Sequence, residues 1–435
     1  MSVYLAQSQA FTATADAIRT KGGTSNTITW DENKGFADAV NSITPPEVSE
    51  SDITFYDYEG TIVESWTLAE LANKTALPAY PSHAGLICQG WNWSLADLKS
   101  TNRKMNVGAM YITDDGKTRI YIHLEEGRTS PMLGVCPNGT VTVDWGDGTT
   151  PDTLTGTSTN TVKWTPNHNY AAPGDYVIKL TVSGTMDFYG GFDEPDGSII
   201  LRYSENRDNR NKVYQRGIRR VEIGTGVTII GNYAFMDCHL LSAITIPSGV
   251  TAIQKQVFQR CWSLPFITIP SGVKSTGIYM MASCYTLSAI AIPSGITSFR
   301  AYYAFLACYT LSSVTIPDVI MVTPQSLFSD CYSLSAITIP ASITDLGYST
   351  FADCYSLSAI TIPASITEIK PEMFYDCYGI AFYDFNNHTA VPTLANTNAF
   401  TGIAADCEIR VPAALVDEWK VATNWATYAD HIVGV

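Results

Sequence analysis

The residues most able to take part in chemistry are seven cysteines that recur in the C-terminal half of the chain. Their spacing is 23 residues, with one step of 24: Cys238, Cys261, Cys284, Cys308, Cys331, Cys354 and Cys377. Cysteines at regular spacing can bind metals or form disulfides. No C-x-x-C pair is present, the number is odd, and none of the six histidines recurs with the cysteines. We therefore expect stacked, buried thiols that behave as small hydrophobic groups, with no metal or other cofactor.

Aromatic residues form a second periodic set. Six of them directly follow a cysteine: Trp262, Tyr285, Tyr309, Tyr332, Tyr355 and Tyr378. Four more lie in segments that differ from copy to copy: Tyr279, Tyr302, Tyr303 and Tyr348. Exposed aromatic rows stack on sugars or form hot spots for protein partners, and the same rows can equally serve as packing over the cysteines. All ten are candidate ligand-binding residues, and the four in the variable segments are the stronger candidates.

The sequence shows no recognisable catalytic motif. It contains no G-x-S-x-G, H-E-x-x-H or P-loop pattern, and its polar residues recur as ladders instead of converging on a pocket. We predict no enzyme activity. The formal net charge of -15 argues against nucleic acid and against anionic membranes. We also expect no secretory signal and no membrane insertion, because polar residues and prolines interrupt every apolar run.

The elements that position these residues follow from the repeat. Within each copy two isoleucines alternate and a proline follows, as in Ile360, Ile362 and Pro363. This alternation predicts a short strand that the proline terminates. One copy cannot bury its apolar edge alone, so the copies must stack into a solenoid with a continuous core. The outward positions of these strands are small, mostly Ala and Thr, so we expect a plain outer face and place function in the variable turns.

The repeat F-x-x-C-x-x-L-x-x-I-x-I-P resembles the leucine-rich repeats of the BspA-like type. The resemblance covers residues 218–382 and implies a binding or adhesion protein, because such repeats occur in bacterial surface proteins and in phage and prophage genes. Residues 383–435 resemble the usual ending of that family. They predict a last strand, CEIRV, and an amphipathic helix from about Pro412 that covers the end of the solenoid.

Residues 116–186 predict an antiparallel β-sandwich. Alternation in Val141, Val143 and Trp145, a WGDGT turn and a second alternating run from Tyr176 to Val182 are the signals. The segments Asp144 to Thr149 and His168 to Val182 resemble the PKD domain. Asp144 and Asp147 could be calcium ligands, but Asp-Gly turns are common in sandwiches, and we favour the turn.

Residues 51–115 predict a small α+β domain. Two strand-like runs flank Glu59-Gly60, and a short helix is expected near Leu68 to Lys74. The segments FYDYEGTIV, ALPAYPSHAGL and GWNW are similar to the internalin-type B-repeat, a β-grasp module. The stretch after GWNW departs from that repeat, and we expect it to be a linker into the first strand of the sandwich.

The N-terminal residues 1–46 predict a helical hairpin around Lys21-Gly22-Gly23. The ADAIRTKGGTS segment resembles modules of tail-associated proteins in phages and prophages, which implies attachment or oligomerisation. Residues 187–217 are expected to be a connector or N-terminal cap. Basic residues cluster from Arg202 to Arg220; we favour a solvated edge or polar cap over a contact with an anionic polymer or an acidic neighbour.

Together these observations predict a multidomain, mainly β protein with a C-terminal leucine-rich-repeat solenoid. The favoured function is a non-enzymatic, phage or prophage tail-associated receptor-binding protein in the virion. It would bind a bacterial surface protein or polysaccharide through the solenoid and other tail or baseplate proteins through its N-terminal module. A homo-oligomer, such as a trimer, is compatible with this role. The alternative is a BspA-like adhesin on the bacterial cell surface.

Overall fold

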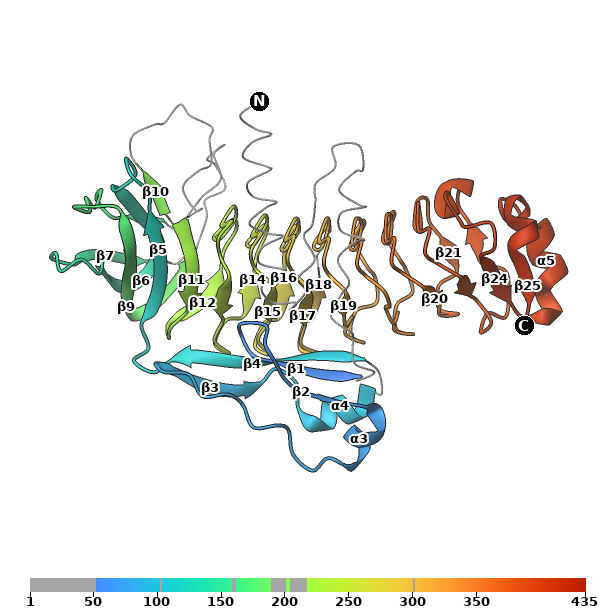
Figure 1. Cartoon of the computed structure of the whole chain (residues 1–435), viewed down its shortest axis with the longest axis horizontal. Coiled ribbons are helices and arrows are strands. Elements are labelled where there is room, and N and C mark those ends of the chain that lie inside the picture. Colours follow the sequence, from blue (N-terminus) through green and yellow to red (C-terminus); the bar gives the residue numbers. More distant parts are fainter. Residues whose placement is uncertain (1–51, 102–103, 159–161, 189–200, 204–216, 300–301) are drawn as a thin grey trace, which may run out of the picture.

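The computed structural model describes residues 52–101, 104–158, 162–188, 201–203, 217–299 and 302–435. Three units are visible: an α+β unit (residues 52–113), an antiparallel unit (residues 118–188) and a long solenoid that begins at Ile218 (Figure 1). The predicted helical hairpin at residues 1–46 and most of the predicted connector at 187–217 lie outside the described residues. The chain is mainly β, as the sequence predicts.

The α+β unit has a four-stranded sheet in the order β2-β1-β4-β3. Its elements are β1 (Ile53–Tyr56), β2 (Ile62–Trp66), α3 (Leu68–Asn73), β3 (Leu86–Trp91), α4 (Leu95–Thr101) and β4 (Met105–Thr113). Helix α3 lies in the predicted place and begins with a capping box between Thr67 and Glu70. Residues 95–113 are not the expected linker: they form α4 and the strand β4, which lies between β1 and β3. The pattern was missed because β4 is buried on both faces and so does not alternate.

The antiparallel unit consists of long strands around β6 and β9. Its elements are β5 (Thr118–Leu124), β6 (Pro131–Asp144), β7 (Asp152–Thr157), β8 (Lys163–Trp164) and β9 (Gly174–Phe188), and β10 (Leu201–Tyr203) pairs with the start of β6. Val141, Val143 and Trp145 are buried, as their alternation predicts. The second predicted run is longer than expected, because β9 continues past Val182 to pair with the solenoid.

Each coil of the solenoid contributes short strands to two parallel ladders. One ladder contains β11 (Ile218–Glu222), β13 (Ala243–Thr245), β15 (Phe266–Thr268), β17 (Ala289–Ala291), β19 (Ser313–Val314), β20 (Ala359–Thr361) and β22 (Phe382–Asp384). The other contains β12 (Val227–Ile230), β14 (Ala252–Ile253), β16 (Ser275–Thr276), β18 (Ser298–Phe299), β21 (Glu368–Ile369) and β23 (Thr393–Leu394). Both ladders are interrupted: in the first, β13 and β15 are not paired and residues 331–340 form no strand, and in the second, β18 and β21 are not paired. We call the outward side of the first ladder the strand face.

The core of the solenoid is a stack of equivalent side chains. Phenylalanine rings of successive coils stack with centroids 5.5–5.8 Å apart, as in Phe305, Phe328 and Phe351. Ile360 and Ile362 are buried, which confirms the predicted alternation. The turns between the cores carry two non-glycine residues with positive φ per coil, for example Ser349 (φ 52) and Asp353 (φ 60). The left-handed conformation turns the chain sharply enough to close each coil.

Both ends of the solenoid are covered by pairing with other elements. At the start, β11 pairs antiparallel with β5 and β12 pairs parallel with β9, so the antiparallel unit extends both ladders (Figure 1). At the end, β24 (Glu408–Val411) and β25 (Ile432–Gly434) continue the first ladder. The predicted C-terminal helix is divided into η3 (Ala413–Leu415), α5 (Val416–Val421) and η4 (Trp425–His431). The break between α5 and η4 contains the extended Ala422 and Asn424, whose φ is 66°. A further 3-10 turn, η2 (Thr397–Phe400), precedes β24.

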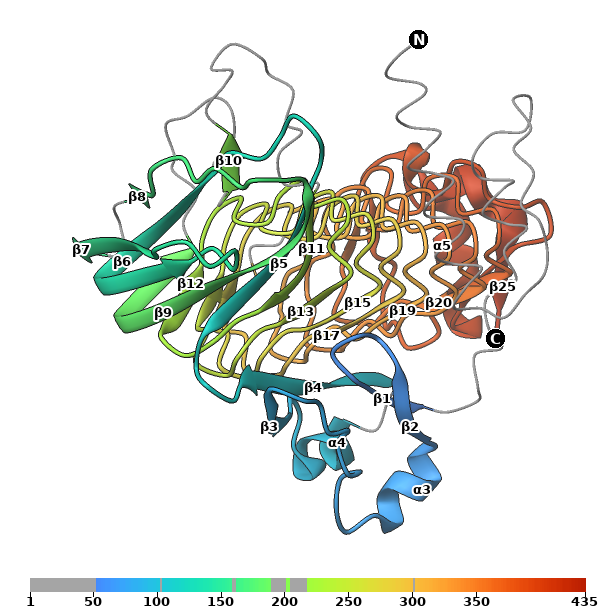
Figure 2. The ribbon, with the colours of Figure 1, turned by 60° about the vertical axis from the view of Figure 1, so that its left-hand side comes forward.

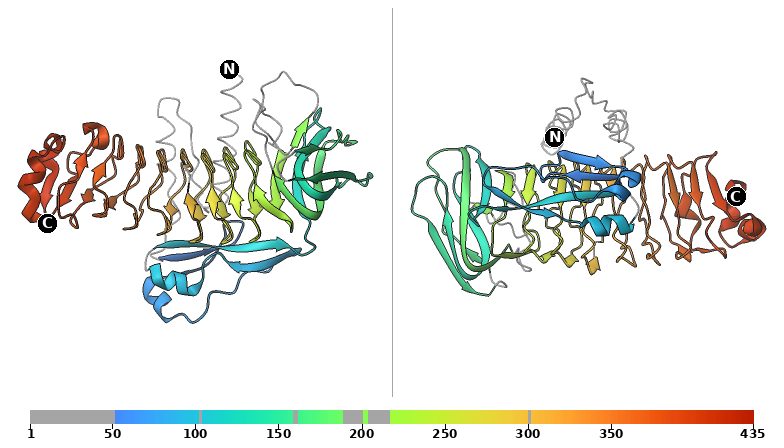
Figure 3. Two further views of the ribbon diagram at one scale, coloured as in Figure 1. Left: turned by 180° about the vertical axis from the view of Figure 1, so that it is seen from behind. Right: turned by 90° about the horizontal axis from the view of Figure 1, so that it is seen from below.

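The α+β unit lies along the strand face of the solenoid. Figures 2 and 3 show β4 running across the coils beneath β13, β15, β17 and β19. The side chains of Val107, Ala109 and Tyr111 enter the core of the α+β unit. The alternate residues Asn106, Gly108 and Met110 approach the solenoid. Both faces of β4 are therefore occupied.

Candidate functional site

The aromatic residues that follow the cysteines form one continuous stack along the solenoid. We call the side of the solenoid with the positive-φ turns the turn side. The stack begins one coil earlier than the sequence indicated, at His239. The ring centroids of His239 and Trp262 are 3.6 Å apart, and the two rings are nearly parallel. Each further pair has centroids 4.7–5.7 Å apart and interplanar angles of at most 21°. The six predicted residues are thus brought together, mainly as neighbours of one another. Burial raises the pKa of Tyr285 and Tyr309.

Exposure separates the candidates into two groups. Most ladder residues are half-buried, whereas Tyr378, at the end of the stack, is 55% exposed. Of the four turn tyrosines, Tyr302 and Tyr348 are each 49% exposed. Tyr279 and Tyr303 are half-buried and stack on each other at 4.7 Å. Tyr302, Tyr348 and Tyr378 are therefore the candidates that present the most ring surface to a ligand.

Aspartates accompany the C-terminal end of the aromatic stack. Asp330 accepts a hydrogen bond from Tyr332 and Asp353 accepts one from Tyr355, at 3.2 and 3.0 Å. Burial raises the pKa of both carboxyls, and for Asp353 the neighbouring Asp330 and Asp376 raise it further. The hydrogen bond to Asp376, together with burial, raises the pKa of Tyr378 to about 12. The tyrosine hydroxyls remain protonated donors at neutral pH.

The seven repeat cysteines are buried, as predicted, and none of them lies in a disulfide. From the second coil on, each thiol donates to the carbonyl oxygen of the core residue one coil earlier; Cys354, for example, donates to Phe328 at 3.3 Å. The same contact recurs for Cys261, Cys284, Cys308, Cys331 and Cys377 at 3.0–3.3 Å. Burial raises the pKa of Cys308 and Cys377 to about 12. These thiols therefore bind neighbouring coils together and are poor nucleophiles.

The two PKD-like signature segments meet in the antiparallel unit. Asp147 accepts hydrogen bonds from Thr149 and contacts His168 at 2.8 Å. The His168 ring stacks on Trp145 at 4.5 Å. Asp144 accepts from the backbone of Gly146. Burial raises the pKa of Asp147, but the contacts with Thr149 and His168 outweigh it, and the net pKa is lowered. Both carboxylates have the local contacts of an Asp-Gly turn.

The strand face is the largest feature that sequence reasoning missed. Asn92 donates to the carbonyl oxygens of Ile269 and Ala291 at 3.2 Å, and the Trp93 indole donates to Ile292 at 3.0 Å. Asn106 donates to the Ser313 hydroxyl at 2.8 Å. These residues come from β3, β4 and the segments beside them. The uniform Ala and Thr positions were the available signal, because a surface of small side chains permits close approach of another backbone.

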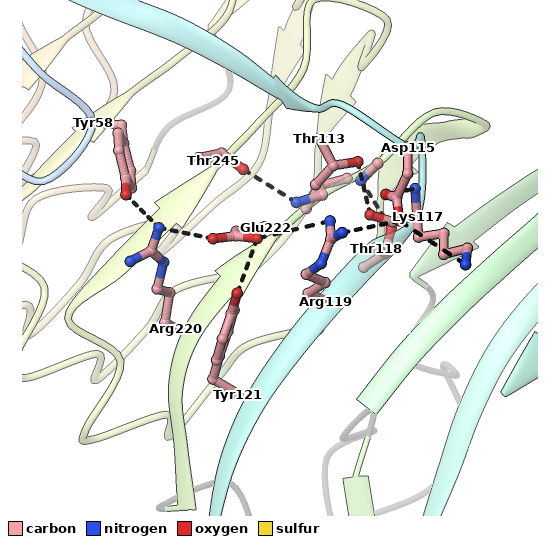
Figure 4. Close-up of polar contacts among 12 residues, drawn as sticks. Tyr58, Thr113, Asp115, Lys117, Thr118, Arg119, Tyr121, Arg220, Glu222 and Thr245 are labelled. Atoms are coloured by element: carbon pink, nitrogen blue, oxygen red, sulfur yellow. Dashed lines mark hydrogen bonds and ion pairs between the residues drawn. The ribbon is translucent and has the colours of Figure 1, made fainter. Parts of the chain in front are cut away.

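A polar junction joins the three units at the first coil (Figure 4). Glu222, on β11, is buried and lies 2.7 Å from Arg220 and 4.0 Å from Arg119. Tyr121 donates to the same carboxylate at 3.1 Å. Arg220 also donates to the hydroxyl of Tyr58, which belongs to the α+β unit. Of the basic cluster, Arg220 thus makes contacts within the chain, and Arg219 pairs with Asp175 at 3.2 Å.

Two classes of site are not found in the described part of the chain. Among those residues, no group of three or more His, Cys, Asp or Glu side chains is arranged to hold a metal ion. No helix in the same residues is long and apolar enough to cross a membrane.

Comparisons with known proteins concern the solenoid. No curated protein matches the chain. Among solved structures, a leucine-rich repeat protein of T. pallidum is 29% identical, with a TM-score of 0.32, and the match covers 33% of this chain and 66% of that one. A leucine-rich repeat protein from Bacteroides ovatus is 26% identical, with a TM-score of 0.37, and the match covers 45% and 55%. The chain therefore spans less than two thirds of either protein.

A leucine-rich cell surface protein from Faecalibacterium prausnitzii is 19% identical, with a TM-score of 0.22, and the match covers 50% of this chain and 87% of that one. The family model described as the BspA type leucine rich repeat region matches residues 210–302 and 301–404, in six copies. The coils, their stacked cysteines and their parallel ladders occupy the same residues. The solenoid therefore matches the BspA type leucine rich repeat region over residues 210–404.

Proposed function

We propose that the chain is a non-enzymatic adhesin of the BspA-like class, displayed on a bacterial cell surface. The solenoid would bind a protein or glycan of another surface through the turn side, where Tyr302, Tyr348 and Tyr378 are located. The observation that carries this proposal is their exposure: 49%, 49% and 55% on a repeat whose other large aromatic residues are mostly buried or half-buried. Exposed aromatic rings are enriched in binding hot spots.

The family match supports an adhesion role, since repeats of this type are found in bacterial surface proteins. The turn segments also differ between coils, whereas the core positions repeat. An irregular surface on a regular scaffold is the arrangement that repeat proteins use for recognition. The small residues of the strand face are less suited to this role in the first coils, because the α+β unit covers them.

The test is adhesion of the purified chain to whole bacterial cells. Tyr302→Ala combined with Tyr348→Ala removes two hot-spot candidates, and we expect a loss of cell binding of about tenfold or more. The free energy of unfolding should change by about 0.5 kcal/mol or less, because both rings are at the surface. Tyr80→Ala, at a 50% exposed ring of the α+β unit, is the matched control and should leave binding unchanged. Equal binding by the double variant would refute the tyrosine site.

A second candidate is a phage or prophage tail-associated receptor-binding protein. The ADAIRTKGGTS segment favours it, because this segment resembles modules of tail proteins. Immunogold labelling with an antibody to the solenoid separates the two functions. Labelled cell walls without labelled tails support the adhesin, and labelled tails support the virion protein.

A further inference from the structure

The α+β unit occupies the strand face in the manner of a bound protein. Its side-chain amides and indole donate to carbonyl oxygens of the solenoid strands, through Asn92, Trp93 and Asn106. The side-chain oxygen of Gln89 accepts a hydrogen bond from the backbone N–H of Ser248 at 2.9 Å. These contacts are mainly with backbone atoms of the solenoid. The strand face can therefore bind a protein surface that presents carboxamide donors and small residues.

The contact between the two units combines side-chain hydrogen bonds with a small number of apolar side chains, and the two hydrophobic cores are separate. The α+β unit has its own hydrophobic core, with Phe55, Trp66 and Trp91 at its centre, and Ala243 is its only solenoid member among the buried residues. The remaining apolar contact is small, consisting of Tyr56 with Phe266, Ala289 and Ala291. An interface of this kind resembles a reversible contact between domains more than a shared core.

The docked arrangement leaves buried polar atoms without partners. The Thr268 hydroxyl lies under β4 and has no hydrogen-bond partner among the described residues. The same holds, in the described part of the chain, for Arg119 Nη1 and Arg220 Nε at the polar junction. Buried donors and acceptors without partners oppose docking, because water would satisfy them when the units separate.

The connection between the units has the form of a hinge and a latch (Figure 4). On the C-terminal side, only the turn from Asp114 to Lys117 links β4 to β5, and it is held by local hydrogen bonds such as Thr113 to the Lys117 carbonyl at 2.8 Å. The latch is Arg220, which joins Tyr58 of the α+β unit to Glu222 of the first coil. Breaking the latch removes the contact at the first coil, and the contacts of Asn92, Trp93 and Asn106 with the strand face remain.

We propose that the strand face of β13, β15, β17 and β19 is a protein-binding surface that the chain covers with its own α+β unit. An external protein with carboxamide donors displaces the unit by taking over its contacts with the strand carbonyls. This inference goes beyond the proposed turn-side adhesion, and it stands whether or not the tyrosine site binds cells. Among the described residues, the α+β unit ends before β20 (Figure 1), and Thr361 on that strand is exposed.

The first test measures opening in the full chain. Thr268→Cys places a thiol under Gly108, and Cys88→Ser removes the only half-buried native thiol among the described residues. Maleimide labelling is followed by peptide mass spectrometry, with Cys354 as an internal reporter of opening of the solenoid core. We expect Cys at position 268 to label faster than Cys354 under native conditions. Equal rates would overturn the proposal, because the surface would then open only when the solenoid unfolds.

Two substitutions sharpen this measurement. A Cβ atom at Gly108 would lie 2.0 Å from the Thr268 hydroxyl, so Gly108→Ala forces the unit away and should raise labelling of position 268 by about tenfold or more. Tyr58→Phe removes the latch hydroxyl and should raise it by about fivefold. Tyr111→Phe is the matched control, since its hydroxyl bonds to Pro81 within the unit, and it should leave the rate unchanged.

The second test concerns the partner. The Gly108→Ala chain, with Thr268 retained, is compared with the wild-type chain for binding to bacterial cells before and after trypsin treatment of the cells. We expect the variant to bind untreated cells at least about threefold better, with the gain lost on treated cells. A gain that survives trypsin would overturn a protein partner, and no gain despite rapid labelling would overturn the binding surface. Cell binding by the chain with Tyr302→Ala and Tyr348→Ala is measured separately. A loss of binding in that variant tests only the proposed function.

Discussion

At the scale of single residues, the solenoid repeats one set of contacts and varies another. From the second coil on, each cysteine thiol donates a hydrogen bond to a backbone carbonyl of the preceding coil. These hydrogen bonds connect the coils outside the strand ladders. The position before the cysteine varies in charge. It is Asp237 and Arg260 in the first two coils and Asp330, Asp353 and Asp376 in the last three. Only the first aspartate has a basic partner in the described chain.

Asp237 is expected to stabilise the first coils in a pH-dependent way. Burial raises its pKa, but the contacts with His239 and Arg260 dominate and lower the value from 3.8 to about 2. The stability that it contributes is therefore present above pH 3.8 and is lost as the pH falls through about 2. Asp237→Asn should lower the free energy of unfolding by about 2 kcal/mol at pH 7.

Chemical denaturation at several pH values checks this expectation. The difference between wild type and Asp237→Asn should shrink below pH 3.8. A constant difference down to pH 2 would show that packing, and not the carboxylate charge, is responsible. Asp353→Asn is a useful comparison, because burial raises the pKa of Asp353 and its loss should increase stability at pH 7.

At the scale of the elements, the coil is defined by its turns as much as by its strands. Strands are only two or three residues long in most coils, and one coil has none on the first ladder at residues 331–340. Two left-handed residues per coil occur at fixed positions, and most of them are not glycine or asparagine. Such residues store backbone strain, which the stacked core must compensate.

Ala307 offers a clean test of this strain. It has φ 57° and no side chain beyond Cβ, so Ala307→Gly relieves the strain without removing a contact. We expect the free energy of unfolding to rise by about 0.5 kcal/mol, the steric relief exceeding the entropy that glycine loses. Ala304→Gly is the control, because Ala304 is fully buried and does not have a positive φ; it should be destabilising. A loss of stability in both variants would contradict the argument from strain.

At the scale of the whole molecule, the three units are coupled through the first coil. The antiparallel unit extends both ladders, and the α+β unit lies on the strand face. Glu222 is the one carboxylate at the centre of this junction that contacts two arginines and a tyrosine. Removing its charge leaves Arg119 and Arg220 with only partly exposed carboxylate partners, Asp115 and Glu59.

Glu222→Gln should therefore weaken the coupling between units. We expect a loss of about 3 kcal/mol and a thermal unfolding profile that separates into two transitions in calorimetry. Glu59→Gln, which removes a 44% exposed partner of Arg220, should change stability by less than about 1 kcal/mol. A single transition at an unchanged temperature for Glu222→Gln would show that the junction does not couple the units.

The sequence alone determined the repeat. Its period of 23, the burial of the cysteines and isoleucines and the short strand before the proline in most coils all follow from local patterns, because identical copies can only bury an apolar edge by stacking. The aromatic stack was also visible as a spacing. Its first member, His239, was missed because histidine does not belong to the aromatic pattern of the other coils. The ten predicted binding residues are located by the structure, and their role remains a proposal.

The tertiary structure determined which other parts of the chain contact the solenoid. β4 was mistaken for a linker because burial on both sides removes the alternation that marks a strand, and the C-terminal helix was predicted as continuous although Asn424 interrupts it. That Ala and Thr positions of the first coils lie against Asn92, Asn106 and Gly108 depends on residues about 200 positions apart. Periodicity indicates which side of a strand is apolar. Long-range contacts alone determine that another unit covers the strand face and that tyrosines on the turn side are exposed.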